Sequence, residues 1–305
     1  MISTNYNILV KIYLERIYAM EKRHTLTLNN GMKMPKMGMG TWYLGENKQT
    51  EETEIRALRV GIDAGIQLID TAEMYGNGRS EKLIGKAIEG YDREKLFLVS
   101  KVLPNNAGRM HIFKSIQQTL SNLKTDYLDM YLLHWRGSIP LEETISCMEQ
   151  LVKEGKIRSW GVSNFDTDDM EELFQIPAGR HCAVNQVLYH LGSRGVEYDL
   201  LPWLKEHNVP LMAYCPLAQA GDLRKGLLEN KVVKQVAKNH EVTEIQILLA
   251  FVLHQGNVIA IPRSGKAEHV LQNQKACEII LTDEEYAALD AAYPAPTHKT
   301  YLDIV

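Results

Sequence analysis

Residues 68–78 read Leu-Ile-Asp-Thr-Ala-Glu-Met-Tyr-Gly-Asn-Gly, and they contain the pattern that decides the fold. A short apolar run ends at Asp70, a loop carrying Tyr75 follows, and a segment with helical spacing of its apolar residues comes next. A short apolar run followed by a longer helical segment is typical of a parallel sheet with crossover helices. The same unit recurs along the chain to about residue 276.

Eight such units can be traced, and a closed (β/α)8 TIM barrel accommodates them more simply than an open sheet does. The expected strands are Lys36–Trp42, Ile66–Asp70, Leu96–Lys101, Leu128–His134, Ile157–Ser163, Ala183–Gln186, Pro210–Tyr214 and Val258–Ile261. Ahead of them, His24–Met34 predicts a β-hairpin, because apolar residues alternate and Asn29-Asn30-Gly31 suits a tight turn. The predicted fold is therefore α/β, a TIM barrel with an N-terminal hairpin.

The composition is that of an ordinary folded protein. The 305 residues are 45% hydrophobic and 24% charged, which argues against disorder and against collagen-like chains. The formal net charge is -4 and no long basic run occurs, so we expect no nucleic-acid partner. At about 150 residues per domain the length allows two domains or one large barrel. A small molecule is the expected partner.

Four cysteines lie far apart, with no spacing typical of a zinc site or a disulfide framework: Cys147, Cys182, Cys215 and Cys277. We therefore expect no metal and a reducing, cytoplasmic location. In residues 1–20, Lys11, Glu15 and Arg16 interrupt the apolar patches before a signal sequence or membrane span is complete. We expect an N-terminal extension at residues 1–22, either a short frayed helix or a stretch ahead of a start at Met20, and one domain at residues 23–305.

Three consecutive strands end in an acid, an ammonium and an imidazole, Asp70, Lys101 and His134. Neighbouring parallel strands lie about 4.8 Å apart, so these groups converge, and Tyr75 can fold over the same patch. An ion pair between Asp70 and Lys101 is the simpler interpretation. With all four residues present, we expect Lys101 to lower the Tyr75 pKa from about 10 and make it a general acid. Neutral His134 would orient a carbonyl oxygen, so the set predicts carbonyl reduction.

Reduction requires a hydride, which no side chain supplies, so a cofactor is expected. Gly38-Met-Gly40 and Gly76-Asn-Gly78 both lack the third glycine of a Rossmann fingerprint. In a barrel a nicotinamide would instead lie across the C-terminal face. Side chains there have suitable chemistry to stack on its ring and fix its carboxamide: Tyr214, Ser163, Asn164 and Gln186.

The chain resembles the aldo/keto reductases from about residue 24 to its C-terminus. The matching stretches are Gly38–Trp42, residues 68–78, Leu98–Lys101, Tyr131–Trp135, Gly155–Phe165, Val184–Val187, Tyr214–Leu217 and Ile261–Ser264. Within the family, residues 188–194 and the Tyr293-Pro-Ala-Pro ending are most similar to bacterial reductases of methylglyoxal and other small aldehydes. The resemblance implies an NADP(H)-dependent reductase that acts as a monomer or weak homo-oligomer.

The resemblance also implies a role for each matching residue. Tyr75 would donate the proton, with Asp70, Lys101 and His134 as its catalytic partners. The walls of the substrate pocket would be Trp42, His134 and Trp135. The expected cofactor-binding residues run from the nicotinamide to the adenosine end: Gly40, Thr41, Trp42, Asp70, Ser163, Asn164, Gln186, Tyr214, Cys215, Pro216, Leu217, Ala218, Gln219, Arg263, Ser264, His269, Gln272 and Asn273.

A preference for NADPH over NADH is predicted from the end of the last strand. Arg263 offers a planar fork for the 2′-phosphate, Ser264 adds a hydroxyl, and Lys266 and His269 add positive potential near a helix N-terminus. The simpler interpretation is that Arg263 is only a solvated charge.

Some positions depart from the family pattern. Arg136 stands where proline is frequent, Leu188 where glutamate is common, His269 where arginine often stacks on adenine, and Cys215 where serine is usual. Two alternatives remain. One is a regulatory barrel that binds the cofactor without catalysis. The other is a lyase using Lys101 as a Schiff-base amine, which Asp70 disfavours by stabilising the ammonium.

Overall fold

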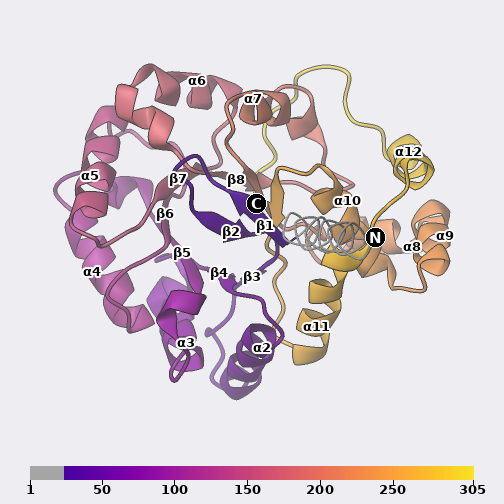
Figure 1. The fold of residues 1–305 in the computed structure, drawn as a ribbon, viewed down its shortest axis with the longest axis horizontal. Helices are drawn as coiled ribbons and strands as arrows, with labels where there is room; N and C mark the ends of the chain where they lie inside the picture. Colours follow the sequence, from indigo (N-terminus) through magenta and orange to yellow (C-terminus); the bar gives the residue numbers. More distant parts are fainter. Residues whose placement is uncertain (1–23) are drawn as a thin grey trace, which may run out of the picture.

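The computed structural model describes residues 24–305, in which eight parallel strands form a barrel surrounded by helices (Figure 1). The strands follow one another in chain order around the sheet. They are β3 (Gly38–Gly40), β4 (Leu68–Asp70), β5 (Phe97–Val102), β6 (Met130–Leu133), β7 (Trp160–Ser163), β8 (Asn185–Leu188), β9 (Leu211–Tyr214) and β10 (Val258–Ala260). Most are shorter than the apolar runs that predicted them, because regular pairing covers only part of each run; β4, β7 and β9, for example, occupy the C-terminal part of theirs.

The barrel closes between its first and last strands. Two isolated parallel bridges, Met37 to Ala260 and Gly40 to Arg263, join β3 to the β10 region. The Gly40 amide also donates to the Pro262 carbonyl oxygen at 3.1 Å. A side chain at Gly40 would lie only 2.8 Å from the Ile261 carbonyl oxygen, so closure requires glycine there. The predicted TIM barrel is confirmed.

Helices follow the strands and cover the outside of the barrel (Figure 1). The first five are α2 (Glu51–Asp63), α3 (Arg79–Ala87), α4 (Ile112–Leu123), α5 (Leu141–Lys153) and α6 (Thr167–Gln175). The remaining six in the described chain are α7 (Leu200–Glu206), α8 (Asp222–Glu229), α9 (Lys231–Asn239), α10 (Glu244–His254), α11 (Ala267–Lys275) and α12 (Asp283–Ala292). Three helices, α8 to α10, separate β9 from β10.

Alternation along the strands decides which side chains face the barrel interior. Leu68, Val99 and Leu132 belong to the apolar cluster inside the barrel, whereas the residues next to them pack outward against the helices. Two positions further along each chain segment, the side chain faces inward again. Those positions are Asp70, Lys101 and His134.

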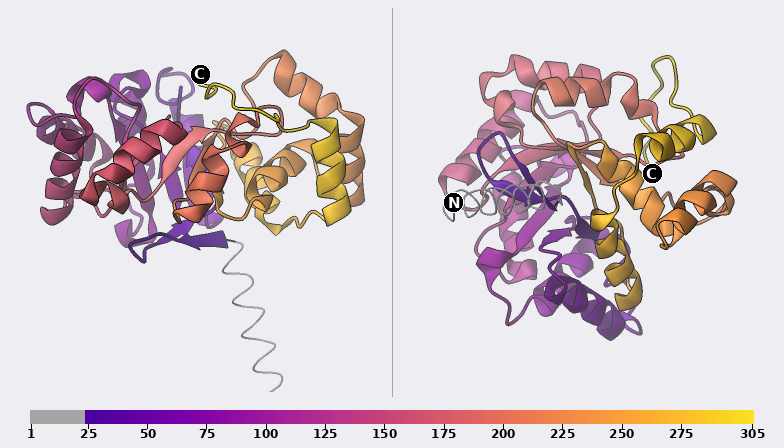
Figure 2. Two further views of the ribbon diagram at one scale, coloured as in Figure 1. Left: turned by 90° about the horizontal axis from the view of Figure 1, so that it is seen from above. Right: turned by 45° about the vertical axis from the view of Figure 1, so that its right-hand side comes forward.

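The predicted hairpin closes the opposite end of the barrel. β1 (Thr25–Thr27) pairs antiparallel with β2 (Lys33–Pro35), and Leu28 and Met34 join the interior apolar cluster. Figure 2 shows the hairpin at one end of the barrel and the chain's C-terminus at the other. The extension expected at residues 1–22 lies outside the described residues. Between residues 24 and 305, no helix is long and apolar enough to cross a membrane. The same residues contain no cluster of three or more histidine, cysteine, aspartate or glutamate side chains that could hold a metal ion.

Candidate active site

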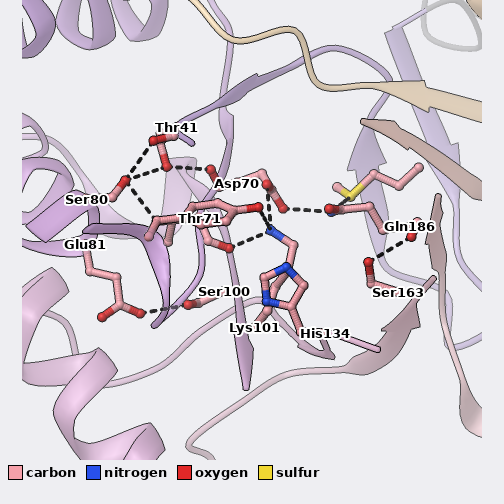
Figure 3. Close-up of polar contacts among 12 residues, drawn as sticks. Thr41, Asp70, Thr71, Ser80, Glu81, Ser100, Lys101, His134, Ser163 and Gln186 are labelled. Atoms are coloured by element: carbon pink, nitrogen blue, oxygen red, sulfur yellow. Dashed lines mark hydrogen bonds and ion pairs between the residues drawn. The ribbon is translucent and has the colours of Figure 1, made fainter. Parts of the chain in front are cut away.

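The Lys101 ammonium lies at the centre of the polar cluster at the strand ends (Figure 3). Its Nζ atom is 2.8 Å from Asp70 Oδ2, 2.7 Å from the Thr71 carbonyl oxygen and 3.2 Å from the Tyr75 hydroxyl oxygen. An ammonium has three hydrogens to donate, and each has an acceptor here. Lys101 is fully buried, so these contacts fix its position. The predicted convergence of Asp70 and Lys101, with Tyr75 folded over them, is therefore present.

Asp70 is held from both sides. Its Oδ1 atom accepts a hydrogen bond from Gln186 Nε2 at 2.8 Å, and its carbonyl oxygen accepts one from Thr41 Oγ1 at 2.9 Å. The Thr41 hydroxyl in turn accepts from Ser80 at 2.8 Å. The buried charge pair is thus supported by hydrogen bonds from three other segments, which a buried ion pair requires to be stable.

Tyr75 comes from the loop after β4, in the short 3-10 turn Tyr75–Gly78. The expectation of a lowered Tyr75 pKa is wrong for this structure. Burial, and after it the Asp70 carboxylate, raise the pKa of Tyr75 well above its ordinary value. The physical reason is that Asp70 balances the charge of Lys101, which leaves little positive potential to offset desolvation. Tyr75 therefore holds its proton in the resting site.

Burial also acts on Lys101 and His134, the two basic side chains beside Tyr75. It lowers the pKa of Lys101, although the contact with Asp70 acts in the opposite direction. His134 is 8% exposed, and burial, followed by the nearby Lys101 charge, lowers its pKa to about 2. The imidazole is therefore neutral, as the sequence predicted, and its ring meets the Tyr75 ring edge-on at 5.8 Å between centroids.

Hydrogen bonds connect His134 to the ends of β7, β8 and β9. Asn164 Nδ2 donates to the His134 carbonyl oxygen at 3.1 Å, and the Tyr214 hydroxyl donates to Asn164 Oδ1 at 2.9 Å. Ser163 Oγ donates to the Gln186 carbonyl oxygen at 2.8 Å. Asn164 has a φ of 56°, a left-handed conformation that asparagine tolerates better than most residues. The four residues predicted for the nicotinamide end thus lie in one place.

A cavity of about 900 Å³ opens over this cluster at the C-terminal ends of the strands. Of the predicted site residues it is lined by Gly40, Thr41, Trp42, Asp70, Tyr75, His134, Trp135, Ser163, Asn164, Gln186, Tyr214, Cys215, Pro216, Leu217, Ala218, Gln219 and Arg263. Lys101 lies behind this lining, in contact with Tyr75. The lining therefore joins the reaction centre to the loop that follows β9.

Comparison with known proteins decides the family. A model described as the aldo/keto reductase family matches residues 36–294. The chain belongs to the aldo/keto reductase family. The family predicted from the sequence is thus confirmed.

Two relatives among those found are named as dicarbonyl reductases. The chain is 53% identical over 280 residues to methylglyoxal reductase YeaE of Escherichia coli, covering 92% of this chain and 98% of that protein. It is 34% identical to the glyoxal reductase of Bacillus subtilis, covering 88% and 92% of the two chains. Two crystal structures of a Klebsiella pneumoniae aldo/keto reductase, one with NADP and acetate and one with NADPH, match with a TM-score of 0.89 and 52% identity, covering 92% of this chain and 99% of theirs.

Four residues predicted to bind the cofactor of this aldo/keto reductase do not line the cavity in the described chain: Ser264, His269, Gln272 and Asn273. Ser264 instead accepts a hydrogen bond from the Lys266 amide at 3.1 Å, and the other three are on α11. His269 is exposed, whereas Asn273 is 4% exposed. Since α11 lies outside the ring of strands, these residues can reach only a ligand that extends beyond the cavity, and their role stays a prediction.

The departures from the family pattern have local explanations. Arg136 donates to the Gly137 carbonyl oxygen at 2.6 Å and to Glu172 at 2.9 Å, so it is held at the cavity wall without a proline. Leu188 is buried at the end of β8. Cys215 is half-buried and has a φ of 48°. Burial raises the pKa of its thiol, which disfavours the reactive thiolate.

Sequence reasoning missed several residues that line the cavity: Tyr43, Met74, Arg136, Ala220, Arg224, Ile261, Pro262, Ile304 and Val305. The last two lie at the end of the C-terminal tail. Lys299 anchors that tail at 2.5 Å from Asp166 and 2.7 Å from Asp199. No periodic pattern indicates this position, because long-range ion pairs determine it.

Proposed function

We propose that this protein reduces small aldehydes and dicarbonyls such as methylglyoxal to alcohols, with NADPH as the hydride donor and Tyr75 as the proton donor. The observation that carries the proposal is a phenol 3.2 Å from a buried ammonium, beside a neutral imidazole, at the wall of one cavity. The relatives named methylglyoxal reductase and glyoxal reductase support the substrate class. The Klebsiella pneumoniae structures support the cofactor.

The residues of the cavity fit a nicotinamide dinucleotide. One end has an aromatic ring, Tyr214, beside the amide groups of Asn164 and Gln186. The other end has Arg224 and Arg263, neither of which is paired with a carboxylate among residues 24–305. A volume of about 900 Å³ is within the range of small-molecule sites. The combination suits a ligand with a planar head and an anionic tail.

When bound, NADPH supplies the hydride. His134, as a neutral imidazole with one N–H donor, can hydrogen-bond the carbonyl oxygen and hold it near Tyr75. As that oxygen gains negative charge it becomes a stronger base than phenolate, so Tyr75 can protonate it even with a raised pKa. Lys101 then stabilises the resulting tyrosinate, and Asp70 keeps the ammonium in place. Trp42 and Trp135 flank the reacting groups, with ring centroids 6.3 Å from Tyr75 and 5.0 Å from His134.

The test is to follow NADPH oxidation by the full chain with a panel of small aldehydes and dicarbonyls, and to identify the alcohol formed. We expect turnover that depends on the carbonyl substrate, with methylglyoxal among those reduced. Tight NADPH binding without turnover of any carbonyl compound would instead support a regulatory barrel. Borohydride treatment in the presence of a keto substrate separates the lyase alternative, because only a Schiff base at Lys101 would leave a covalent label.

A further inference from the structure

A carboxyl group on α3 is buried behind the reaction centre. Glu81 is 1% exposed, and both of its oxygens accept hydrogen bonds from neutral side chains. Oε1 accepts from Ser100 Oγ at 2.8 Å, and Oε2 accepts from Asn122 Nδ2 at 2.9 Å. Burial raises the pKa of Glu81, because these hydrogen bonds offset only part of the loss of water. The carboxyl group therefore costs free energy that a leucine would not, and what it provides is a connection from α3 to β5 and α4.

The contact with β5 is made at the residue next to the ammonium. Side chains alternate along this strand, so Ser100 faces outward and Lys101 faces the barrel interior. Figure 3 shows the hydrogen bond between Glu81 and Ser100 next to the contacts of Lys101. Glu81 therefore holds β5 from outside the barrel, directly behind the group that contacts Tyr75.

The loop that carries Tyr75 ends where α3 begins. The three residues between Tyr75 and α3 have positive φ values of 55°, 56° and 81°, and two of them are glycines. Glycine populates several backbone conformations, so this segment alone does not fix the position of Tyr75. Its two ends are held instead, Tyr75 by Lys101 at 3.2 Å and α3 by the contact of Glu81 with Ser100. Both ends are thus attached to consecutive residues of one strand.

The helix on which Glu81 lies is itself closely seated against α4. A side chain at Gly78, just before α3, would lie 2.9 Å from Asn122 Nδ2, and one at Gly85 would lie 2.4 Å from the Asn122 carbonyl oxygen. Asn122 is oriented in turn by Gln118, whose Nε2 donates to Asn122 Oδ1 at 3.0 Å. Because α3 has so little space against α4, Glu81 connects β5 to a firmly held helix.

The distance between phenol and ammonium is where this connection affects the reaction. The Tyr75 hydroxyl oxygen is 3.2 Å from Lys101 Nζ, whereas a charge-assisted N–H···O contact is usually 2.7–2.9 Å long. The pair is therefore close enough to interact but has no closeness to spare. A small shift of the loop would weaken the stabilisation of tyrosinate by the ammonium.

We propose that Glu81 is a positioning residue for carbonyl reduction, which joins α3 to β5 beside Lys101 and so sets the distance between the Tyr75 phenol and the ammonium. This inference rests on the proposed function, in which Tyr75 donates the proton. It differs from a merely structural role, in which Glu81 would contribute to stability without affecting the rate of the folded enzyme.

The experiment compares wild-type protein with Glu81→Leu, Glu81→Gln and Ser100→Ala. Each protein is saturated with NADPH and mixed with methylglyoxal, and a single turnover is recorded. The amplitude counts the folded, active sites, whereas the rate reports the reaction in each of them. The NADPH dissociation constant is measured by cofactor fluorescence, and thermal unfolding shows whether each variant is folded.

The variants separate the hydrogen bonds from the bulk and charge of the side chain. Glu81→Gln keeps both contacts, since its amide oxygen can accept from Asn122 and its amide nitrogen can donate to the Ser100 hydroxyl. Ser100→Ala removes only the contact with β5. The matched control is Glu149→Leu, because Glu149 on α5 accepts from Trp160 Nε1 on β7 at 2.7 Å and does not line the cavity of the described chain.

We expect Glu81→Leu to lower the single-turnover rate about ten- to a hundredfold, as a misplaced reacting group does, with the NADPH dissociation constant within about threefold of wild type. Ser100→Ala should lower the rate by a smaller factor, and it decides the matter if Glu81→Leu does not fold. Glu81→Gln and the control should stay within about threefold of wild type. The proposal is overturned by a lower amplitude at an unchanged rate, by a wild-type rate in Ser100→Ala, or by a Glu81→Gln rate as low as that of Glu81→Leu.

A double variant shows whether Glu81 acts through Tyr75. Substitutions that act through one group are not additive, so adding Glu81→Leu to Tyr75→Phe should lower the remaining rate by less than about threefold. A further loss as large as in the wild-type background would mean that Glu81 acts elsewhere and would overturn the proposal. A wild-type rate in Tyr75→Phe alone, or wild-type protein that does not reduce any carbonyl compound, would instead contradict the proposed function.

Discussion

The reaction centre and the arginine-lined part of the cavity, proposed above to bind the anionic part of the cofactor and called the phosphate end below, are built in different ways. Asp70 and Lys101 are on strands, are almost fully buried and have protein partners for their charges. Arg224 and Arg263 are on a helix and a loop, are more exposed and have no carboxylate partner in residues 24–305. One region is complete before any ligand arrives, whereas the other retains unpaired donors.

This difference follows from the cost of burying charge. A buried ammonium needs its partner in the folded protein, because water cannot solvate it there. An exposed arginine is solvated by water, so it can remain without an anionic partner at little cost in free energy. We therefore expect substitutions in the reaction centre to affect both chemistry and stability, and substitutions at the phosphate end to affect only cofactor binding.

The largest effect is expected for Lys101→Met. It removes the ammonium that stabilises tyrosinate, so kcat should fall by at least about a hundredfold, within the range typical of lost acid–base catalysis. It also leaves Asp70 buried without its cation, which costs about 3–5 kcal/mol of stability. The control is the double variant Lys101→Met/Asp70→Asn, which should recover stability but not activity. If Lys101→Met alone kept the kcat and the urea midpoint of the wild type, the reaction centre would not differ from the phosphate end in the way described.

At the phosphate end, Arg263→Ala should raise the KM for NADPH about ten- to a hundredfold and barely change that for NADH. Arg263 now donates only to the Trp42 carbonyl oxygen, at 3.1 Å, which leaves most of its fork available. Lys266→Ala, a neighbouring exposed cation outside the cavity lining, is the matched control and should have a smaller effect. An equal rise in both KM values would mean that Arg263 does not recognise the 2′-phosphate.

The buried His134 makes stability depend on pH. Its pKa is lowered to about 2 in the folded protein but is about 6.5 when unfolded, so acid protonates the unfolded chain first. The contribution of neutral, buried His134 to the free energy of unfolding is therefore complete above pH 6.5 and is lost progressively as the pH falls below 6.5. From pH 6.5 to 5.0 the wild type should lose about 2 kcal/mol more than His134→Gln in urea unfolding. The exposed His269→Gln variant should behave as wild type, and equal pH slopes for all three proteins would refute the assignment.

The smallest effect is expected for Lys299→Met, which releases the C-terminal tail that brings Ile304 and Val305 to the cavity. The partly exposed ion pairs of Lys299 contribute at most about 1 kcal/mol each, so the KM for the carbonyl substrate should rise only several-fold. The KM for NADPH should stay nearly constant, and the unfolding midpoint should fall much less than in Lys101→Met. Lys95→Met removes a distant surface pair with Asp92 and is the control. A fall in kcat as large as that of Lys101→Met would place the tail in the reaction centre.

The contrast between the reaction centre, which is on strands, and the phosphate end, which is on a loop and a helix, also explains what could be predicted from the sequence. Asp70, Lys101 and His134 each follow an inward-facing apolar residue by two positions, so strand alternation alone indicates that they meet. The direction of the Tyr75 pKa could not be predicted, because it depends on burial and on how far Asp70 balances Lys101.

The phosphate end was predicted less well. Arg224 reaches the cavity through hydrogen bonds to a loop with two left-handed non-glycine residues, and Val305 through a tail held by Lys299. Neither arrangement has a periodic sequence pattern. Conversely, the resemblance to the family implied roles for His269 and Gln272, which lie outside the cavity lining in the described chain.

The most direct test of the central claim is a single-turnover experiment on Tyr75→Phe. The variant and the wild type are saturated with NADPH and mixed with methylglyoxal, and the cofactor's dissociation constant is measured on the same preparations. The ring still packs beside Trp42 while the transferable proton is gone, so we predict an unchanged dissociation constant within about threefold and a rate lower by about 10²–10⁴-fold. A rate near that of the wild type, or a loss of cofactor affinity that matches the loss of rate, would contradict the account.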